Sequence, residues 1–130
     1  EVTISLQNVK SLFKPDKYKN IHYIKWGISD DIKNILEIDA YETLFTETFE
    51  GKNITSNIIT RDNYPLMINT KFTYTKTNPI IIDNSLISVP EHIENNLNKM
   101  YNITLKIGKI FINETHIKYP LHLVKIELVR

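Results

Sequence analysis

The stretch NITLKIGKIFINETHIKYPLHLVKIELV, residues 102–129, carries the strongest fold signal in the chain. Every second residue is apolar from Ile103 to Ile107, and the same alternation returns from Val124 to Leu128. A period of two residues is typical of a strand that buries one face and exposes the other. Turn-forming residues separate the alternating segments, so the stretch predicts a meander of antiparallel strands at the C-terminus.

Further strand signals occur along the rest of the chain. Residues 2–6 alternate in the same way. Segments rich in threonine and other β-branched or aromatic residues predict weaker strands at 43–49, 54–60, 66–68 and 71–77. β-Branched side chains pack well on a pleated surface, which favours strands in these segments.

Two segments have helical patterns. Residues 89–101 follow Ser88, and Glu91 comes three residues after it, which is the capping box that satisfies two backbone amides at a helix N-terminus. Residues 30–38 follow Ser29 and have acidic residues in the first turn, where the helix dipole favours negative charge. Both segments repeat apolar residues at helical spacing. The sequence therefore predicts two helices.

These elements predict an α+β fold in which two helices cover a mostly antiparallel β-sheet. A β-sandwich with short helical insertions is the competing architecture. With 130 residues, of which 42% are hydrophobic and 24% charged, the chain is large enough for one self-standing core. No linker, repeat or low-complexity run divides it, so residues 1–130 are expected to form a single domain.

Several kinds of chemistry lack the residues that they need. The chain has no cysteine, which excludes disulfides, thiolate metal sites and cysteine nucleophiles. Its three glycines, Gly27, Gly51 and Gly108, are isolated, whereas a phosphate-binding loop needs closely spaced glycines. No nucleophile motif surrounds any serine, and the four histidines lack the spacing of a zinc site. The sequence therefore predicts no catalytic site, no metal site and no cofactor.

The amino-acid composition is uneven. Isoleucine, asparagine and lysine supply 50 of the 130 residues, against one alanine, three glycines and two arginines. Because the first three have AT-rich codons, we infer an AT-rich genome, such as that of many viruses. Lysine is then partly a codon choice, which weakens a lysine cluster as evidence for a binding site. No apolar run is long enough for a transmembrane helix and no signal peptide is visible, so the sequence assigns no localisation.

The most distinctive surface candidate is KSLFKPDKYKNIHYIKW, residues 10–26, with five lysines, four aromatic residues and one acid. If residues 17–26 form one strand, Tyr18 and Trp26 lie on an inward face, while the lysines and Tyr23 lie on the exposed face. Lysines neutralise phosphates or lipid headgroups, and exposed rings stack on bases or lie at a membrane interface. A solvated edge strand whose lysines deter aggregation is the competing interpretation. The predicted anion-binding residues are Lys14, Lys17, Lys19, Tyr23 and Lys25.

Residues 27–50 have the opposite charge, with seven acidic residues and one lysine. The loop spacing of a calcium site is absent from this run. We interpret it as a solvated face, or as a surface that pairs with the basic segment of another copy.

Two stretches resemble known families. The opening EVTISLQNVKSLF, followed by NIHYIKWGI, resembles the first two strands of C2 domains, which are β-sandwiches that bind membranes, often through calcium held by aspartates. Only Asp16 stands in the matching loop, so this resemblance implies the fold without the calcium mechanism. VPEH, residues 89–92, with a strand from Tyr101 to Ile112, is similar to rhabdovirus matrix proteins. That resemblance implies a sheet packed on two helices, self-association, and basic segments that bridge membrane and nucleocapsid.

The sequence therefore predicts a non-enzymatic interaction or assembly domain. The first hypothesis is a viral structural or matrix-like protein that contacts an anionic membrane surface or a nucleoprotein through residues 10–26. The second is a protein-binding effector that uses an exposed sheet edge, and the third is a nucleic-acid-binding domain. A protein partner or self-association is expected.

Overall fold

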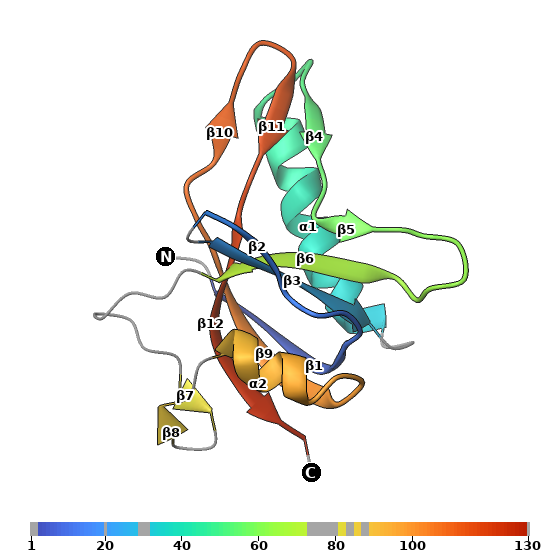
Figure 1. Cartoon of the computed structure of the whole chain (residues 1–130). Coiled ribbons are helices and arrows are strands. Elements are labelled where there is room, and N and C mark those ends of the chain that lie inside the picture. Colours follow the sequence, from blue (N-terminus) through green and yellow to red (C-terminus); the bar gives the residue numbers. More distant parts are fainter. Residues whose placement is uncertain are drawn as a thin grey trace.

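The computed structural model describes residues 3–19, 21–28, 32–72, 81–82, 85–86 and 89–129. Strands make up 51% of it, and five of them wind into a closed barrel (Figure 1). In chain order the barrel strands are β1 (Thr3–Ser11), β3 (Ile21–Ile28), β6 (Met67–Phe72), β9 (Met100–Ile107) and β12 (Leu121–Leu128). The remaining elements lie in the connections between these strands.

The strand order around the barrel is β3, β1, β9, β12 and β6, and β6 pairs with β3 to close it. All neighbours are antiparallel except β12 and β6, which are parallel. A five-stranded Greek-key barrel of this kind is an OB fold. The predicted α+β fold of two helices on a sheet is therefore wrong, and so is the β-sandwich, because the sheet closes on itself and forms both layers of the core. The barrel also differs from the architectures that the two family resemblances imply.

The barrel core is filled by inward-facing residues at alternating strand positions. Trp26 is fully buried, and its ring lies edge-on to Tyr101 with 5.4 Å between centroids. The indole N–H of Trp26 donates to Thr70 Oγ1 at 3.0 Å, and the Thr70 hydroxyl donates to the Ile24 carbonyl at 2.8 Å. A buried indole is stable where its N–H finds an acceptor. Trp26 thereby joins β3, β6 and β9 inside the barrel.

Two register shifts bend the long strands. β1 shifts against β9 between Leu6 and Val9, where Asn8 has a φ of 55°. β12 shifts against β9 between Leu123 and Lys125. An extra residue in one strand increases its local bend and twist. These shifts allow strands of eight and nine residues to curve around a small barrel.

A three-stranded arm stands away from the barrel (Figure 1). It consists of the hairpin β10 (Phe111–Ile112) and β11 (His116–Lys118), with β4 (Asn53–Thr55) parallel to β11. We call residues 109–119 together with β4 the arm. The hairpin connects β9 to β12, which pair with each other in the barrel. The predicted meander over 102–129 is thus interrupted, because two of its strands leave the barrel sheet.

Four other short strands complete the described sheets. β2 (Asp16–Tyr18) pairs with β3, and β5 (Ile58–Ile59) pairs with β6, so both extend the barrel sheet. β7 (Ile81–Ile82) and β8 (Ser85–Leu86) form a separate two-stranded sheet.

The first helix is longer than the predicted segment 30–38. α1 runs over Ile32–Thr48, so the strand expected at 43–49 is wrong. Ile38 is fully buried and Phe45 packs against the barrel core, two helical turns away. Burial of this helical face outweighs the strand preference of the threonines.

The second helix is shorter than the predicted segment 89–101. α2 covers only Val89–Asn95. Asn98 has a φ of 65°, a conformation that asparagine adopts and that ends helices, and its N–H donates to the Ser11 carbonyl at 2.7 Å. Tyr101 is instead fully buried in β9, so burial of this ring in the barrel replaces the last helical turns.

The predicted helix caps Ser29 and Ser88 lie outside the described residues, as do residues 73–77 of the strand expected at 71–77. Neither helix, over the residues that the structure describes, combines the length and the apolar character needed to cross a membrane.

Candidate functional site

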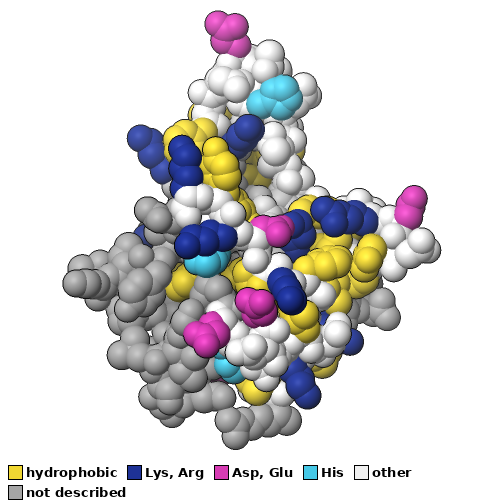
Figure 2. Space-filling model, viewed as in Figure 1, with side chains coloured by type: hydrophobic (Ala, Val, Ile, Leu, Met, Phe, Trp, Pro, Cys, Tyr) yellow, Lys and Arg dark blue, Asp and Glu magenta, His cyan; other side chains and the backbone are white. Residues whose placement is uncertain are grey.

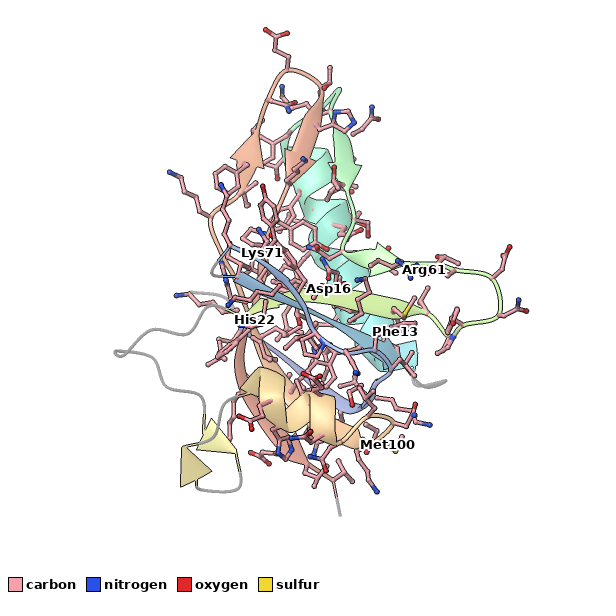
Figure 3. All side chains as sticks on the ribbon, in the orientation of Figure 1. Phe13, Asp16, His22, Arg61, Lys71 and Met100 are labelled. Atoms are coloured by element: carbon pink, nitrogen blue, oxygen red, sulfur yellow. The ribbon has the colours of Figure 1, made fainter. Side chains whose placement is uncertain are left out.

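One row of side chains crosses the outer wall of the barrel. Strand pairing places Asp16 of β2 beside Tyr23 of β3, and Tyr23 beside Lys71 of β6. It also places Lys71 beside His122 of β12, and His122 beside Lys106 of β9. Residues directly opposite on neighbouring strands project from the same face of a sheet. We call these five residues the barrel row; Figure 3 labels two of them, Asp16 and Lys71.

The barrel row is cationic and partly shielded from water. Tyr23, Lys71, His122 and Lys106 are half-buried, and Lys71 Nζ lies 5.8 Å from the centroid of the Tyr23 ring. Burial lowers the pKa of the His122 imidazole, and the ammonium groups of Lys71 and Lys106 lower it further. An anion in this row would meet two lysine ammonium groups, and its charge would offset the repulsion that lowers the pKa of His122.

The one acid of the barrel row is paired. Lys25 Nζ lies 3.3 Å from Asp16 Oδ2, and the Lys25 side chain is only 18% exposed. Lys25 follows Tyr23 by two residues on β3 and so lies on the same face. This ion pair offsets the charge of Asp16 and leaves the wall positive.

A glycine allows His122 to lie against the barrel wall. A Cβ atom on Gly108 would lie 2.5 Å from His122 Nε2 and 2.7 Å from Pro120 Cγ. Any side chain at this position would therefore displace the imidazole. Gly108 is also the residue at which the chain leaves β9 for the arm, so this close approach joins the barrel row to the base of the arm.

Tyr18 is 64% exposed, so its expected inward position is wrong. Residues 17–26 do not form one strand, because Tyr18 pairs with Ile21 across a reversal of the chain and Lys19 has a φ of 56°. The reversal places Tyr18 on the same outer face as Tyr23. The Lys19 ammonium lies 5.5 Å from the centroid of the Tyr18 ring.

The same reversal moves Lys17 to the other face, where it pairs with His22 of β3. Burial lowers the pKa of the His22 imidazole, and the Lys17 ammonium lowers it further. The His22 ring lies 6.3 Å from that of Phe72, which is part of the core. Trp26 lies on this face of β3 and is fully buried, as the sequence predicts.

The structure brings two of the five predicted anion-binding residues, Tyr23 and Lys25, to the outer face of β3, whereas Lys17 lies on the opposite face of β2. Tyr23 is in the barrel row and Lys25 is beside it, while Lys17 and Lys19 belong to the β2 hairpin. Lys14 is separate, because its ammonium lies 3.7 Å from an acid of α2.

Sequence reasoning did not single out Lys71, Lys106 or His122. Each stands at a polar position of a strand, which is the only local signal that it faces outward. Their meeting depends on which strands are neighbours, and the local pattern does not contain that information.

The arm carries exposed apolar side chains. Phe111 is 60% exposed and Ile112 is 43% exposed. Lys118 pairs with Phe111 across the hairpin, and Lys109 precedes β10; both lysines are exposed. Figure 2 shows apolar and basic side chains together over the arm, on the same side of the molecule as the β2 hairpin. Exposed apolar groups bordered by cations are a feature of contact surfaces.

Glu42 of α1 ties the arm to the body of the protein. Its side chain is 8% exposed and accepts hydrogen bonds from the hydroxyl of Ser56, at 2.7 Å, and from the hydroxyl of Tyr119. The side-chain amide of Asn57 donates to the Tyr119 carbonyl at 2.7 Å. Burial raises the pKa of the Tyr119 phenol, and its hydrogen bond to the Glu42 carboxylate raises it further. Glu42 is thus not part of a solvated acidic face, whereas the other described acids of that run are exposed: Glu37, Asp39, Glu47 and Glu50.

Lysine ammonium groups, imidazoles and aromatic rings occupy the outer wall and the arm. Among the described residues, no three His, Asp or Glu side chains lie close enough together to hold a metal ion.

No protein-family model matches the sequence, and no curated protein matches it. The fold is similar to that of solved phage proteins. The single-stranded DNA-binding protein from bacteriophage Enc34, truncated at its C-terminus, superposes with a TM-score of 0.65 at 12% identity, covering 98% of this chain and 86% of that one. The protein from the same phage in complex with single-stranded DNA gives a TM-score of 0.65 at 10% identity, over 98% and 86%.

A third similar structure is gp2.5, a single-stranded DNA-binding protein encoded by bacteriophage T7. Its TM-score is 0.58 at 11% identity, covering all 100% of this chain and 92% of that one. At these identities the likeness is one of fold, and it extends over nearly the whole of each chain.

Proposed function

We propose that the protein binds single-stranded DNA along the barrel row, without catalysis. The observation that carries this proposal is the course of the row across β3 and β6, the second and third barrel strands. OB folds bind oligonucleotides on this face, together with the loops after the first and fourth barrel strands. In this chain those two loops contain the β2 hairpin and the β10–β11 hairpin of the arm.

Cations and ring faces suit a flexible single strand. Lys71 and Lys106 would neutralise phosphates, while Tyr18, Tyr23 and Phe111 offer rings on which unpaired bases stack. Bases in a duplex stack on one another and present no free face to a ring. The net charge of the protein is only +1, so attraction at long range is weak and binding depends on this local wall.

The structural comparisons change the order of the three hypotheses from the sequence. All the similar structures named above are of single-stranded DNA-binding proteins, which favours a nucleic-acid partner over a membrane surface. A membrane surface attracts exposed cations, but the lysines of the barrel row are half-buried in the wall. An effector needs a long open sheet edge, whereas β2 and β5, at the edges of the barrel sheet, have three and two residues.

The test is a comparison of ligands across a salt series. Fluorescence anisotropy should show that labelled oligodeoxythymidylate binds more tightly than the same length of duplex. Its affinity should fall with salt at a slope of about 0.7 per neutralised phosphate. Vesicles with and without anionic lipid serve as the competing ligand. No binding of the single strand, or stronger binding to anionic vesicles, would overturn the proposal.

Affinity for single-stranded DNA should rise as the pH falls from about 7 to about 5. The pKa of His122 is lowered in the free protein by burial and by Lys71 and Lys106. A phosphate near these lysines offsets their repulsion and raises that pKa, so binding takes up a proton. Above both pKa values the imidazole is neutral with or without DNA, and the dependence disappears.

Anisotropy titrations of His122→Gln check this assignment. The variant should bind at neutral pH and lose most of the pH dependence. His22→Gln is the matched control, because the pKa of His22 is also lowered but His22 lies outside the barrel row. Full pH dependence in His122→Gln would contradict the role of His122.

Self-association stays a prediction, and α1 has a surface that fits it. Leu36 and Leu44 are 58% and 52% exposed and lie eight residues apart, on one face of the helix. We expect the sedimentation coefficient of the wild-type protein to rise with concentration, and Leu44→Glu to sediment as a monomer. A wild-type protein that stays monomeric at high concentration would contradict this expectation.

A further inference from the structure

We propose that Phe13 and Tyr64, with Arg61 beside them, form a second stacking site for a DNA base, which we call the aromatic step. This inference rests on the proposed function and adds a contact for the same strand. The aromatic step lies at the end of β3 and β6 opposite to the barrel row.

Two loops far apart in sequence build the aromatic step. Phe13 follows β1, and Tyr64 precedes β6. Their ring centroids are 5.3 Å apart, with 55° between the ring planes. Tyr64 is 50% exposed, while Phe13 is half-buried. Because half of its surface is exposed, the Tyr64 ring can also contact a third ring.

The core does not need this pair. A Cβ atom on Gly27 would lie 2.7 Å from Leu12 Cδ1 and 3.4 Å from Pro65 Cγ, so these two side chains already cover the outer face of β3 at Gly27. Phe13 follows Leu12 in the chain, and Tyr64 precedes Pro65. The Tyr64 ring, which is 50% exposed beside these apolar side chains, is therefore accessible to a ligand.

The loop that carries Tyr64 contains a hydrogen-bonded turn. The backbone N–H of Tyr64 donates to the Arg61 carbonyl at 3.3 Å, which closes a turn. Asn63 within this turn has a φ of 66°, a left-handed conformation that asparagine tolerates. A ring that is positioned before binding loses little conformational freedom when a base stacks on it.

The aromatic step continues the path of the barrel row along one face. Tyr23, Lys25 and Gly27 alternate on the outer face of β3, so Lys25 stands between the row and the step. Four residues at about 3.3 Å each separate Tyr23 from Gly27 by about 13 Å. Figure 3 places Phe13 and Arg61 toward one end of this face and Lys71 toward the other. Figure 2 shows apolar side chains with a basic neighbour at the end where Figure 3 labels Arg61.

If the strand runs from the barrel row to the aromatic step, the length of an oligonucleotide decides which of the two it contacts. OB folds bind about 4 to 16 nucleotides. An oligomer of about 4 nucleotides fits the barrel row alone, whereas one of about 16 nucleotides also reaches the aromatic step. A base stacked on Tyr64 would then raise the affinity of the longer oligomer only.

Tryptophan fluorescence gives a direct reading of this contact. Trp26 is the single native tryptophan and is fully buried, so its emission is a constant background. In Tyr64→Trp, a thymidylate oligomer of about 16 nucleotides should quench the introduced tryptophan, and one of about 4 nucleotides should bind without quenching it. Tyr64→Ala should bind the longer oligomer about tenfold more weakly and the shorter one as the wild type does.

Each outcome has a distinct meaning. Tyr64→Phe should retain the affinity of the wild type, because stacking needs the ring and not the hydroxyl. Equal losses for both lengths in Tyr64→Ala, or binding of the longer oligomer by Tyr64→Trp without quenching, would overturn the aromatic step and leave the proposed function intact. Failure of the wild-type protein to bind either oligomer would remove the proposed function and the aromatic step with it.

Discussion

Lys71→Glu should weaken binding of single-stranded DNA by about two powers of ten at low salt. Lys71 is the middle residue of the barrel row, with Tyr23 on one side and His122 on the other. A hydrogen bond to a charged group contributes about 1.5–3 kcal/mol, and about 1.4 kcal/mol changes Kd tenfold. The introduced carboxylate would also repel the phosphate that the lysine attracted. Fluorescence anisotropy measures the loss, and the salt slope should fall by about 0.7 for each phosphate contact removed.

Lys10→Glu is the charge-matched control, measured with an oligomer of about 4 nucleotides, because Lys10 pairs with Gly27 at the end of β3 that carries the aromatic step. It changes the net charge by the same amount, but Lys10 is exposed near the far end of β1. Thr3, at the other end of β1, pairs with Lys106 of the barrel row. Seven residues at about 3.3 Å place Lys10 about 20 Å away from that end. Equal losses in Lys10→Glu and Lys71→Glu would show that overall charge, rather than the barrel row, governs binding.

Trp26→Ala should lower the free energy of unfolding by about 3–5 kcal/mol, the largest stability effect that we expect from one substitution. The indole fills the barrel against Tyr101, and its N–H satisfies the buried Thr70 hydroxyl. Alanine leaves a cavity that the curved strands around it cannot close without breaking their pairing. Urea unfolding followed by circular dichroism measures the change, with the slope m as a check that the transition stays two-state.

Two further variants serve as controls for Trp26→Ala. Trp26→Phe should cost less than Trp26→Ala, because most of the volume is kept and only the hydrogen bond to Thr70 is lost. Tyr18→Ala removes an aromatic ring of the same hairpin that is 64% exposed, and should change stability by no more than about 0.5 kcal/mol. A loss in Tyr18→Ala as large as that in Trp26→Ala would contradict the assignment of the two rings to opposite faces.

Local periodicity predicted where the barrel strands lie in the sequence, but it did not predict how they pair. The alternating positions Ile103, Leu105 and Ile126 are buried, because a strand with one apolar face must turn that face inward whatever its neighbours are. The threonines of the segment 43–49 favour a strand, yet the segment is helical. There the spacing of Ile38 and Phe45 allowed a helix as well, and the barrel surface beneath them decided between the two.

The candidate site was predictable only where it depends on one strand. The alternation within β3 placed Tyr23 and Lys25 outward and Trp26 inward. It misplaced Tyr18, because the reversal before Ile21 exchanges the faces of β2. Because this turn was not predicted, Lys17 was assigned to the outer face and Tyr18 to the inner face. The structure has them the other way round.

The sequence by itself determined a β-rich chain without cysteine chemistry, the inward and outward positions in β3 and β9, and a basic aromatic segment near the N-terminus. Only the tertiary structure decided that the sheet closes into a barrel, that Lys71, His122 and Lys106 join Tyr23 in one row, and that Glu42 is buried beneath the arm. The physical reason is the range of the interactions. Alternation is a property of neighbouring residues, whereas strand pairing joins residues far apart in the chain and is set by burial of the whole core at once.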